Sequence, residues 1–467
     1  MRLLGNIFIA ILNDGNMKTE HSFVNNSDHT FKEYENIAIP ESERNHKSSE
    51  LFTLWFATNL TIGDFAIGFI PVLLNLSLEM TFLALITGNV FGASLLAYMS
   101  KTGPFTGLPQ MIAGRRAFGN RFGIFMSGLQ WLNTLGWLTV NLVLAAFAFT
   151  LAFHIPYYEV SIILLAIIIF MISFSGRKLI SYFEKIMSVV LGIMFSFIII
   201  SSLFKISYIY AYKPVYYGFG VAFGITLATS FSYIMSWGPY AADYSRYNKE
   251  KNTFIYTFSG GFIASLWAEI AGVFIAILSF NPSGNPAIDL KSVLGPYGIV
   301  GLFAIFLGGI AADAINLYSN SVSLKTTGIK MKRFNTVMIG IVVSIILAIT
   351  TYSKFYSFYE DFLFILDYWI TPWIGIMIAD FFIINRHREF DTKKIPGFNK
   401  SGIFSYFIAL LISIPFMDPG VIYEGIISKL YLGGVDISYY VSFIIALLLY
   451  PLIKKIINKR TITNNVK

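Results

Sequence analysis

The chain has 467 residues, of which 55% are hydrophobic and only 13% charged, and its mean hydropathy is +0.65. A soluble protein carries about 25% charged residues, so this composition excludes an ordinary soluble fold. The net charge of +8 would suit a nucleic-acid partner, but the positions of the basic residues argue against one. Cysteine is absent, which excludes disulfides and cysteine-based metal or redox sites.

Long apolar runs separated by short charged segments predict an all-α integral membrane protein. About 20 helical residues cross a hydrocarbon core of roughly 30 Å, whereas the strands of a barrel would alternate with period two. We expect twelve spans and no soluble domain. The predicted spans lie at approximately 51–74, 79–100, 122–150, 157–175, 182–204, 218–240, 254–279, 296–321, 334–352, 360–384, 402–417 and 438–453.

Lysine and arginine concentrate on one side of this predicted membrane. Most of them fall in the N-terminal tail, in alternate loops and in the C-terminal tail; the exceptions are Lys205, Lys213, Lys291, Lys354 and Lys429. The positive-inside rule therefore places both termini in the cytoplasm. We expect a multi-pass protein of the cell (plasma) membrane, in contact with lipid and without a nucleic-acid partner.

Both ends of the chain are polar, and we expect loose cytoplasmic tails at 1–50 and 457–467. The apolar piece LLGNIFIAIL near the start is too short to span a membrane. It also lacks the small-residue cleavage site of a signal peptide. We interpret it as an interfacial segment, with Met17 as an alternative start of the chain.

Two spans contain residues that break helices. The first span, LWFATNLTIGDFAIGFIP, carries Asn59, Thr61, Gly63 and Asp64 in its middle, and the sixth carries Gly238–Pro239 within SWGPYAADYSRY. Proline has no N–H and clashes with the preceding turn, while glycine relaxes the backbone. Irregular backbone at membrane depth survives only where protein or a wet cavity satisfies its polar groups. Main-chain groups at both breaks are therefore candidates for binding a ligand.

The two breaks lie five spans apart, at matching positions in two halves of the chain. Such a pair is typical of secondary transporters built from inverted repeats, with the substrate held between the broken helices. We therefore expect a first repeat at 51–205, a second at 206–385 and two extra spans within 386–456. A kink in a packed helix would explain either break alone, but the matched pair favours a transport site.

The third span carries Trp137 and Asn141, four residues apart and so on one helical face. An indole can stack on a flat heteroaromatic ring, which contributes about 1–3 kcal/mol per base in nucleic-acid sites. The neighbouring amide could hydrogen-bond the edge of such a ring. Without a ligand, the same pair would be a packed tryptophan beside an interhelical amide.

Acidic residues lie within several spans. Asp313 and Asn316 share a face of the eighth span, and a carboxylate in mid-membrane indicates a functional site. No Lys or Arg lies in the middle of any predicted span to pair with it, so Asp313 could bind Na⁺, carry a proton or accept a substrate N–H. Asp64 would either belong to the functional site or cap the second half of the first span, and Glu269 and Asp367 receive no role from their sequence context.

Asp243 and Arg246 close the sixth span at its predicted cytoplasmic end. We expect Asp243 to pair locally or with Arg115 or Arg116, and to act as a hinge or gate.

Several stretches of this sequence resemble the nucleobase:cation symporter-1 family, which contains cytosine/purine permeases and hydantoin transporters. They spread over residues 51–384 in the order found in that family. The stretches are WFATNL in the first span, GPFTGLPQMIAGRRAFG at 103–119, SWGPYAADYSRY in the sixth span, INLYS in the eighth and FLFILDYWITPWIGIMIADFF in the tenth. The resemblance implies the leucine-transporter fold, a 5+5 inverted repeat plus two helices, which agrees with the paired breaks.

The resemblance also implies a substrate site. Its stacking indole falls on Trp137, a second aromatic wall on Trp237, and its remaining substrate-binding positions on Thr61, Asn141, Ser236 and Asn316. Coupling positions fall on the carbonyls of Ala57 and Leu60 and on Asp313, where Na⁺ could be held. Sodium-coupled members are expected to supply hydroxyls from the eighth span, but the corresponding stretch here is 309–312, Gly-Ile-Ala-Ala, so Na⁺ and H⁺ coupling both stay open.

The resulting hypothesis is a symporter that imports a nucleobase or related planar heterocycle by alternating access. The coupling ion is Na⁺ or H⁺, with no other cofactor and no obligatory protein partner. An amino-acid or amine transporter of the same fold is the alternative. An enzyme is disfavoured because no metal-ligand cluster, cysteine nucleophile or Ser–His arrangement occurs, and a passive channel would not need paired broken helices.

Overall fold

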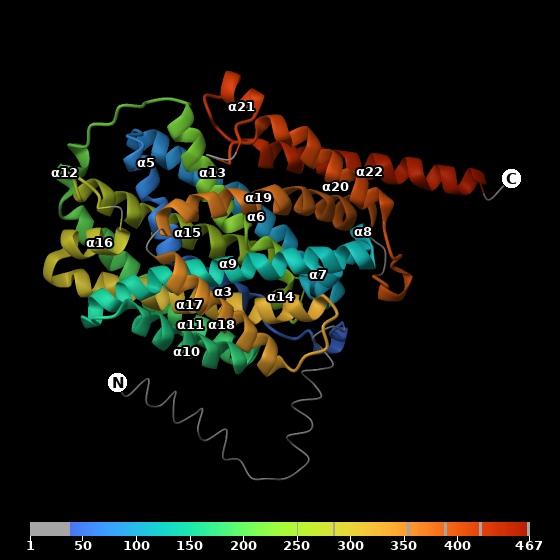
Figure 1. Cartoon of the computed structure of the whole chain (residues 1–467), viewed down its shortest axis with the longest axis horizontal. Coiled ribbons are helices and arrows are strands. Elements are labelled where there is room, and N and C mark those ends of the chain that lie inside the picture. The colour runs from blue at the N-terminus through green and yellow to red at the C-terminus, as the bar shows by residue number, and fades with distance from the viewer. Residues whose placement is uncertain are drawn as a thin grey trace, which may run out of the picture.

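The computed structural model describes residues 38–249, 251–283, 285–352, 355–386, 390–419 and 423–464. Within these ranges the chain is helical and contains no β-strand, only two isolated backbone bridges, His46–Asn248 and Leu76–Tyr216. Most helices run in roughly the same direction and pack side by side (Figure 1). The prediction of an all-α protein is confirmed.

Every predicted span coincides with a helix or with a broken helix. In chain order these are α3 (Ser49–Asn59) with α4 (Ile62–Ile67) and α5 (Phe69–Leu73), α6 (Leu78–Thr106), α9 (Asn120–Phe153), α10 (Tyr158–Phe174), α11 (Arg177–Leu203), α13 (Val221–Met235) with α14 (Ala241–Ser245), α15 (Thr253–Leu278), α17 (Gly298–Thr326), α18 (Arg333–Thr351), α19 (Phe355–Ile378) with the π-helix η5 (Ala379–Ile384), α20 (Lys400–Ser413) and α22 (Ser438–Asn464). Shorter helices connect them: α7 (Gln110–Ala113), α8 (Arg115–Phe118), α12 (Ile206–Tyr210), α16 (Pro286–Leu294) and α21 (Ile426–Tyr431).

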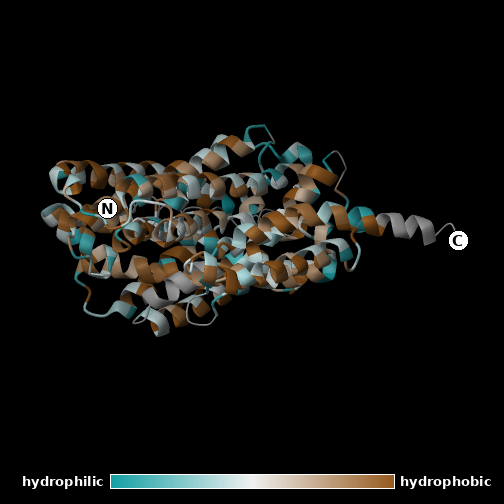
Figure 2. Ribbon diagram, turned by 90° about the horizontal axis from the view of Figure 1, so that it is seen from above, coloured by the Kyte–Doolittle hydropathy of each residue, from teal (hydrophilic) through white to brown (hydrophobic). Residues whose placement is uncertain are grey.

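Length and composition qualify eight helices of the described chain to cross a membrane, or nine when α3 and the α4–α5 pair count as one bent span. The predicted number of twelve therefore stays a prediction. The outward faces are strongly apolar: Val189 and Ile193 of α11 and Leu411 of α20 are each more than 60% exposed. Hydrophobic residues run along the outer helices, and hydrophilic residues are frequent in the connecting segments (Figure 2). Apolar faces of this extent need a lipid environment.

Both predicted breaks are present. α3 ends at Asn59 and α4 begins at Ile62, with a bend of 54° between the two halves of the first span. α13 ends at Met235, and a short 3₁₀ turn over Gly238–Tyr240 separates it from α14. The proline lies at the start of this turn, where its missing N–H costs least.

Three boundaries differ from the predictions. The sixth span does not end at 240 but resumes after its break and runs to Ser245, so the Gly-Pro pair lies inside the span. The last helix continues to Asn464, into the predicted C-terminal tail. The N-terminal tail is fixed in its last part, because the Ile39 N–H donates to the Gly107 carbonyl at 3.0 Å and Ile39 is buried. The LLGNIFIAIL piece and Met17 lie outside the described residues.

The two halves interlock through their central helices. α17 packs along α9, α13 along α6, and α15 along α3 and α6, while α20 and α22 lie beside α19 at the edge of the bundle (Figure 1). The broken first and sixth spans are therefore enclosed by unbroken helices, which places their exposed main-chain groups within the protein.

Candidate functional site

The break in the first span is tied to the sixth span by side chains. Thr61 has an extended backbone and caps α4, because its Oγ1 accepts the Asp64 N–H at 3.4 Å. The same Oγ1 lies 2.5 Å from the Tyr233 hydroxyl of α13. Asp64 itself is not the cap, which excludes one of its two expected roles; its carboxylate accepts from Ser265 of α15. Residue 61 has the hydroxyl that a cap needs, and Asp64 lies too far into the helix.

Tyr233 joins the first, third and sixth spans. Its ring packs edge-on against Trp137 with 5.1 Å between centroids. A Cβ on Gly63 would lie 2.8 Å from the Tyr233 ring, so glycine is required for this approach. On its other side Trp137 packs against Phe362 of α19 at 5.3 Å. The predicted stacking indole is thus buried where the two broken spans meet α9 and α19.

Asp313 joins the third and eighth spans. Its Oδ1 accepts the side-chain amide of Asn141 at 3.2 Å and that of Asn316 at 3.2 Å. Asn316 in turn accepts the Tyr240 hydroxyl at 2.9 Å. This chain of hydrogen bonds connects α9, α17 and the break in the sixth span, and all four side chains are fully buried. Three of the predicted site residues are therefore brought together.

The second predicted tryptophan lies at the break in the sixth span. Trp237 is buried and packs against Trp55 at 5.8 Å and against Tyr240 at 5.4 Å. The neighbouring Ser236 hydroxyl donates to the Tyr233 carbonyl at 2.6 Å, one of the carbonyls released at the end of α13. Ser236 therefore satisfies the break itself and keeps only acceptor capacity for another group.

Several buried polar atoms at this site have no hydrogen-bond partner among the described residues. They are Asn141 Oδ1, Asp313 Oδ2 and Trp237 Nε1. A buried polar atom without a partner costs about 1–3 kcal/mol. Two acceptors and one donor are thus available to a polar ligand next to buried aromatic rings.

The positions expected to bind a coupling ion are only partly brought together. The Ala57 carbonyl accepts the Leu60 N–H at 3.3 Å, and the Leu60 carbonyl lies against α17, where a Cβ on Gly308 would be 2.3 Å from it. Gly309 packs on Ala145 of α9 in the same way, at 2.7 Å. The hydroxyl-free stretch therefore serves close helix packing, while Asp313 is engaged by amides.

The predicted gate has a partner that was not expected, Gln110. Asp243 Oδ1 accepts the backbone N–H of Gln110 at 2.9 Å, and Gln110 Oε1 accepts the Ala242 N–H at 3.0 Å. Arg116 instead pairs with Asp380 at 2.5 Å. The α7 helix begins at Gln110, so its free N–H groups attract the carboxylate more directly than a distant guanidinium.

Arg115 donates to the Thr326 carbonyl at 2.5 Å, so neither of the two arginines named for Asp243 binds it. Arg246 is buried and donates to the Tyr247 hydroxyl at 3.0 Å. Burial alone would raise the pKa of the Tyr247 hydroxyl, but the Arg246 and Arg177 guanidinium groups beside it hold that pKa below its ordinary value.

Hydrogen bonds join the predicted cytoplasmic ends of the first and sixth spans. The His46 N–H donates to the Tyr247 carbonyl at 3.1 Å, and Asn248 Nδ2 donates to the Lys47 carbonyl at 2.8 Å. Arg177 of α11 donates to the Tyr244 carbonyl at 3.1 Å and lies 4.1 Å from the centre of the Tyr247 ring. We name this set of contacts the inner clasp.

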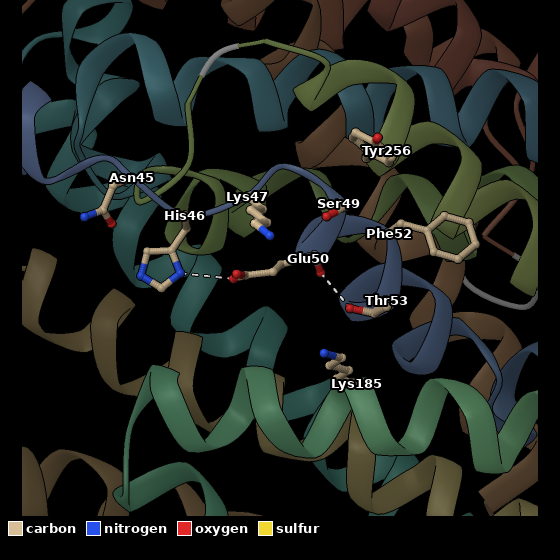
Figure 3. A pocket seen from close by; sticks show the side chains of 9 residues that line it. All are labelled: Asn45, His46, Lys47, Ser49, Glu50, Phe52, Thr53, Lys185 and Tyr256. Atoms are coloured by element: carbon tan, nitrogen blue, oxygen red, sulfur yellow. Dashed lines mark hydrogen bonds and ion pairs between the residues drawn. The ribbon is translucent and has the colours of Figure 1, made fainter.

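A cavity of about 680 Å³ lies beside the inner clasp, far along the first span from its break. Figure 3 shows its lining: the start of α3 and the segment before it, with Lys185 of α11 and Tyr256 of α15. His46 and Glu50 form a 3.0 Å contact on its wall. None of the predicted substrate-binding residues lines this cavity, so it is a different site from the one built around Trp137.

Three residues that organise the site were not predicted: Tyr233, Tyr240 and Gln110. Tyr233 and Tyr240 lie at the two sides of the Gly-Pro break, and their aromatic-plus-hydroxyl character is a signal that could have been used. Gln110 lies within the GPFTGLPQMIAGRRAFG stretch, but its contact with Asp243 joins residues far apart in sequence, and no local pattern predicts it.

Comparison with known proteins gives the family. A family model described as permease for cytosine/purines, uracil, thiamine, allantoin matches residues 38–442. The putative purine-cytosine permease YxlA of Bacillus subtilis (strain 168) is 28% identical over 451 residues, covering 90% of this chain and 96% of the relative. The purine-cytosine permease fcyB of Emericella nidulans is 26% identical over 447 residues, covering 88% and 86%. The vitamin B6 transporter TPN1 of Saccharomyces cerevisiae is 22% identical over 365 residues, covering 72% and 62%.

Solved structures give the fold. Mhp1, a nucleobase-cation-symport-1 family transporter in a closed conformation with bromovinylhydantoin bound, superposes with a TM-score of 0.72 at 19% identity, covering 91% of this chain and 96% of Mhp1. The Eremococcus coleocola manganese transporter superposes with a TM-score of 0.57 at 13% identity, covering 87% and 94%. Both likenesses support the leucine-transporter type of membrane fold. The chain belongs to the permease family for cytosine/purines, uracil, thiamine and allantoin, the nucleobase:cation symporter-1 family.

Proposed function

We propose that this protein imports a nucleobase or related planar heterocycle across the cell membrane, driven by H⁺ or Na⁺, with both termini in the cytoplasm. The observation that carries the proposal is the pair of unpartnered acceptors, Asn141 Oδ1 and Asp313 Oδ2, buried beside Trp137. The edge of a nucleobase presents N–H donors and carbonyl or ring-nitrogen acceptors in one plane, and its faces stack on indoles.

Each predicted residue has a task in this proposal. Trp137 and Trp237 supply aromatic walls, Asn141 and Asn316 contact the ring edge, and Ser236 accepts one further hydrogen bond. Thr61 holds the broken first span against Tyr233. Asp313 fixes the orientation of both amides and senses the coupling ion, together with the carbonyls of Ala57 and Leu60 if that ion is Na⁺.

Alternating access would open and close the inner clasp. The contacts of Arg177 with His46 and with the Tyr244 carbonyl hold the predicted cytoplasmic ends of the first and sixth spans together, and the Asp243–Gln110 pair joins the sixth span to α7. Inward opening requires these contacts to separate while the substrate stays between the breaks. The relatives' names support this function: they include purine-cytosine permeases and a vitamin B6 transporter, all with ring-shaped substrates.

The test is a thermal-shift screen of the purified protein against purines, pyrimidines, hydantoins, allantoin and vitamin precursors, with amino acids and amines as the comparison set. Uptake of each hit into proteoliposomes then follows, with pH and Na⁺ gradients imposed separately. The proposal predicts stabilisation and uptake by at least one heterocycle and a dependence on one gradient. Stabilisation by amino acids or amines alone would establish the alternative instead.

A further inference from the structure

A second group of buried polar side chains lies away from Trp137, between the first, second, sixth and seventh spans. The side chains include Asp64 of α4, Asn89 of α6, Ser230 of α13 and Glu269 of α15, all fully buried. Ser265 lies four residues before Glu269 and so on the same face of α15. We name these five residues the carboxyl cluster.

The two acids of the cluster are neighbours. Ser265 Oγ donates to Asp64 Oδ2 at 2.5 Å, so Asp64 lies one helical turn from Glu269 on the face of α15. Asn89 donates from its amide to Glu269 Oε2. The Ser230 hydroxyl donates to the Leu85 carbonyl at 3.3 Å and also contacts the Glu269 carboxyl group.

The cluster has fewer hydrogen-bond donors than acceptor oxygens. Asp64 Oδ1, Glu269 Oε1 and Asn89 Oδ1 have no hydrogen-bond partner within the described ranges. No Lys, Arg or His in those ranges forms a hydrogen bond or ion pair with either carboxylate. Two adjacent carboxylates in a buried site cannot both be ionised, because each disfavours the charged form of the other. At least one proton is therefore held here, and a protonated carboxyl also supplies a missing O–H donor.

The surrounding groups do not offer another charge. Tyr233, the titratable residue of α13 closest in sequence to Ser230, uses its hydroxyl with Thr61. Glu184 of α11 is also buried, but its carboxylate oxygens form no hydrogen bond with any described residue, the cluster included. The two carboxyl groups therefore act on each other without a third charged group bonded to either of them within the described ranges.

The packing favours a proton over a hydrated metal ion. A Cβ on Gly68 would lie 2.1 Å from the Glu269 carbonyl, and a Cβ on Gly272 would lie 2.0 Å from the Phe65 carbonyl. The second half of the first span, α4 and α5, which we call its outer half, is thus in backbone contact with α15. This contact leaves little room for an ion with bound water. Asp64 lies just after the break, whereas Glu269 lies on an unbroken helix, so movement of α4 changes their separation.

We propose that Asp64 and Glu269 form a proton-binding pair, separate from Asp313, whose proton is released and regained as the outer half of the first span moves. This inference rests on the proposed transport function. No bond other than O–H is made or broken: the proton leaves a carboxyl for water on one side of the membrane and is replaced from the other. The pair would make H⁺ the coupling ion.

The experiment compares wild type, Asp64→Asn and Glu269→Gln in proteoliposomes, with Glu184→Gln as a matched control that neutralises a buried acid elsewhere. A pH gradient of one unit drives about tenfold accumulation for one proton per substrate. We expect that accumulation in the wild type and the control, and its loss in both pair variants. Substrate exchange without a gradient should stay within about twofold of wild type, because exchange needs no net proton movement.

Three outcomes would overturn the inference. Both pair variants could accumulate substrate as the wild type does, they could lose exchange while the control keeps it, or they could lose a dependence on Na⁺ rather than on pH. A substrate-free measurement separates this inference from the transport proposal. Infrared spectra of the purified protein should contain a protonated-carboxyl band that is absent from Glu269→Gln and present in Glu184→Gln. If the band is present but no heterocycle is transported, the transport proposal fails and the proton site stands.

Discussion

The hydroxyls of Thr61 and Tyr233 lie 2.5 Å apart and join the break in the first span to the first half of the sixth. Thr61 is at the same time the cap of α4, so a single side chain closes one half-helix and holds it to the other repeat. Tyr233 also packs on Trp137. This arrangement makes the shape of the proposed site depend on a hydrogen bond between two broken helices.

The loss of this hydrogen bond should weaken substrate binding, and the effects of substitutions at the two positions should not be additive. A buried hydrogen bond contributes about 0.5–1.5 kcal/mol, so Tyr233→Phe should lower affinity by about two- to tenfold. Thr61→Val should have a similar effect. The double variant should lose less binding free energy than the two single variants lose together, as measured by equilibrium binding in a double-mutant cycle. Strict additivity would show that the two hydroxyls act independently.

Trp137→Ala should weaken heterocycle binding by about 5- to 150-fold, because base–aromatic stacking contributes about 1–3 kcal/mol. Trp137→Phe keeps a ring and should lose less. Trp131 lies on the same helix but on another face, so Trp131→Phe is the matched control. Isothermal titration of the purified variants measures each affinity. Equal losses in Trp131→Phe and Trp137→Phe would contradict a stacking role.

Asp313 can be tested by separating its charge from its role as an acceptor. Asp313→Asn keeps an oxygen for the amides of Asn141 and Asn316, and the variant should fold with a melting temperature near that of wild type. Asp313→Ala leaves two buried donors without an acceptor, at a cost of about 1–3 kcal/mol each, and should melt at a clearly lower temperature. Thermal unfolding in detergent checks both expectations. Equal melting temperatures of the two variants would show that the amides do not depend on this residue.

The inner clasp should open when Arg177 is replaced. Arg177→Gln removes the guanidinium that stacks on Tyr247 and reaches the Tyr244 carbonyl. The chain has no native cysteine, so a single Ala242→Cys reports on this position without background. Maleimide labelling of Ala242→Cys should be faster with Arg177→Gln than without it. Arg121→Gln, at an arginine on the outside of α9, should leave the rate unchanged; equal acceleration by both changes would exclude a specific clasp.

The contacts of Asp380 should stabilise the docking of the last helix. Its carboxylate meets Arg116 at 2.5 Å and Lys454 of α22 at 3.0 Å, and it is fully buried. Removal of one partner from a buried ion pair costs about 3–5 kcal/mol. Asp380→Asn should therefore lower the melting temperature strongly. Asp391→Asn breaks the exposed pair with Lys394 and should change it little, since surface pairs contribute about 0–1 kcal/mol.

Much of the architecture could be predicted because membrane helices leave a strong signal in sequence. Apolar runs predicted the position of every long helix of the described chain but not the short connecting helices, and the Gly-Pro pair marked the break in the sixth span. The predicted end of that span was wrong, since the residues after the break are polar but buried against other helices. Asp243 is an example: it is buried because Gln110 offers it a backbone N–H.

Contacts between helices could not be predicted. Asp313 and Asn316 were correctly placed together because they lie three residues apart on one helix. Their link to Asn141 and Tyr240 joins separate helices, and no local pattern encodes it. Likewise, Asp64 and Glu269 are far apart in the sequence and look like isolated acids there. Only the packing of α4 on α15 brings them together.

Counterflow of a radiolabelled heterocycle into proteoliposomes preloaded with the same compound tests the central claim most directly, because it needs binding and alternating access but no ion gradient. The account predicts counterflow with wild-type protein and its loss with Trp137→Ala and with Asn316→Ala, while Trp131→Phe retains it. Undiminished counterflow in both Trp137→Ala and Asn316→Ala would contradict the placement of the substrate between the broken helices.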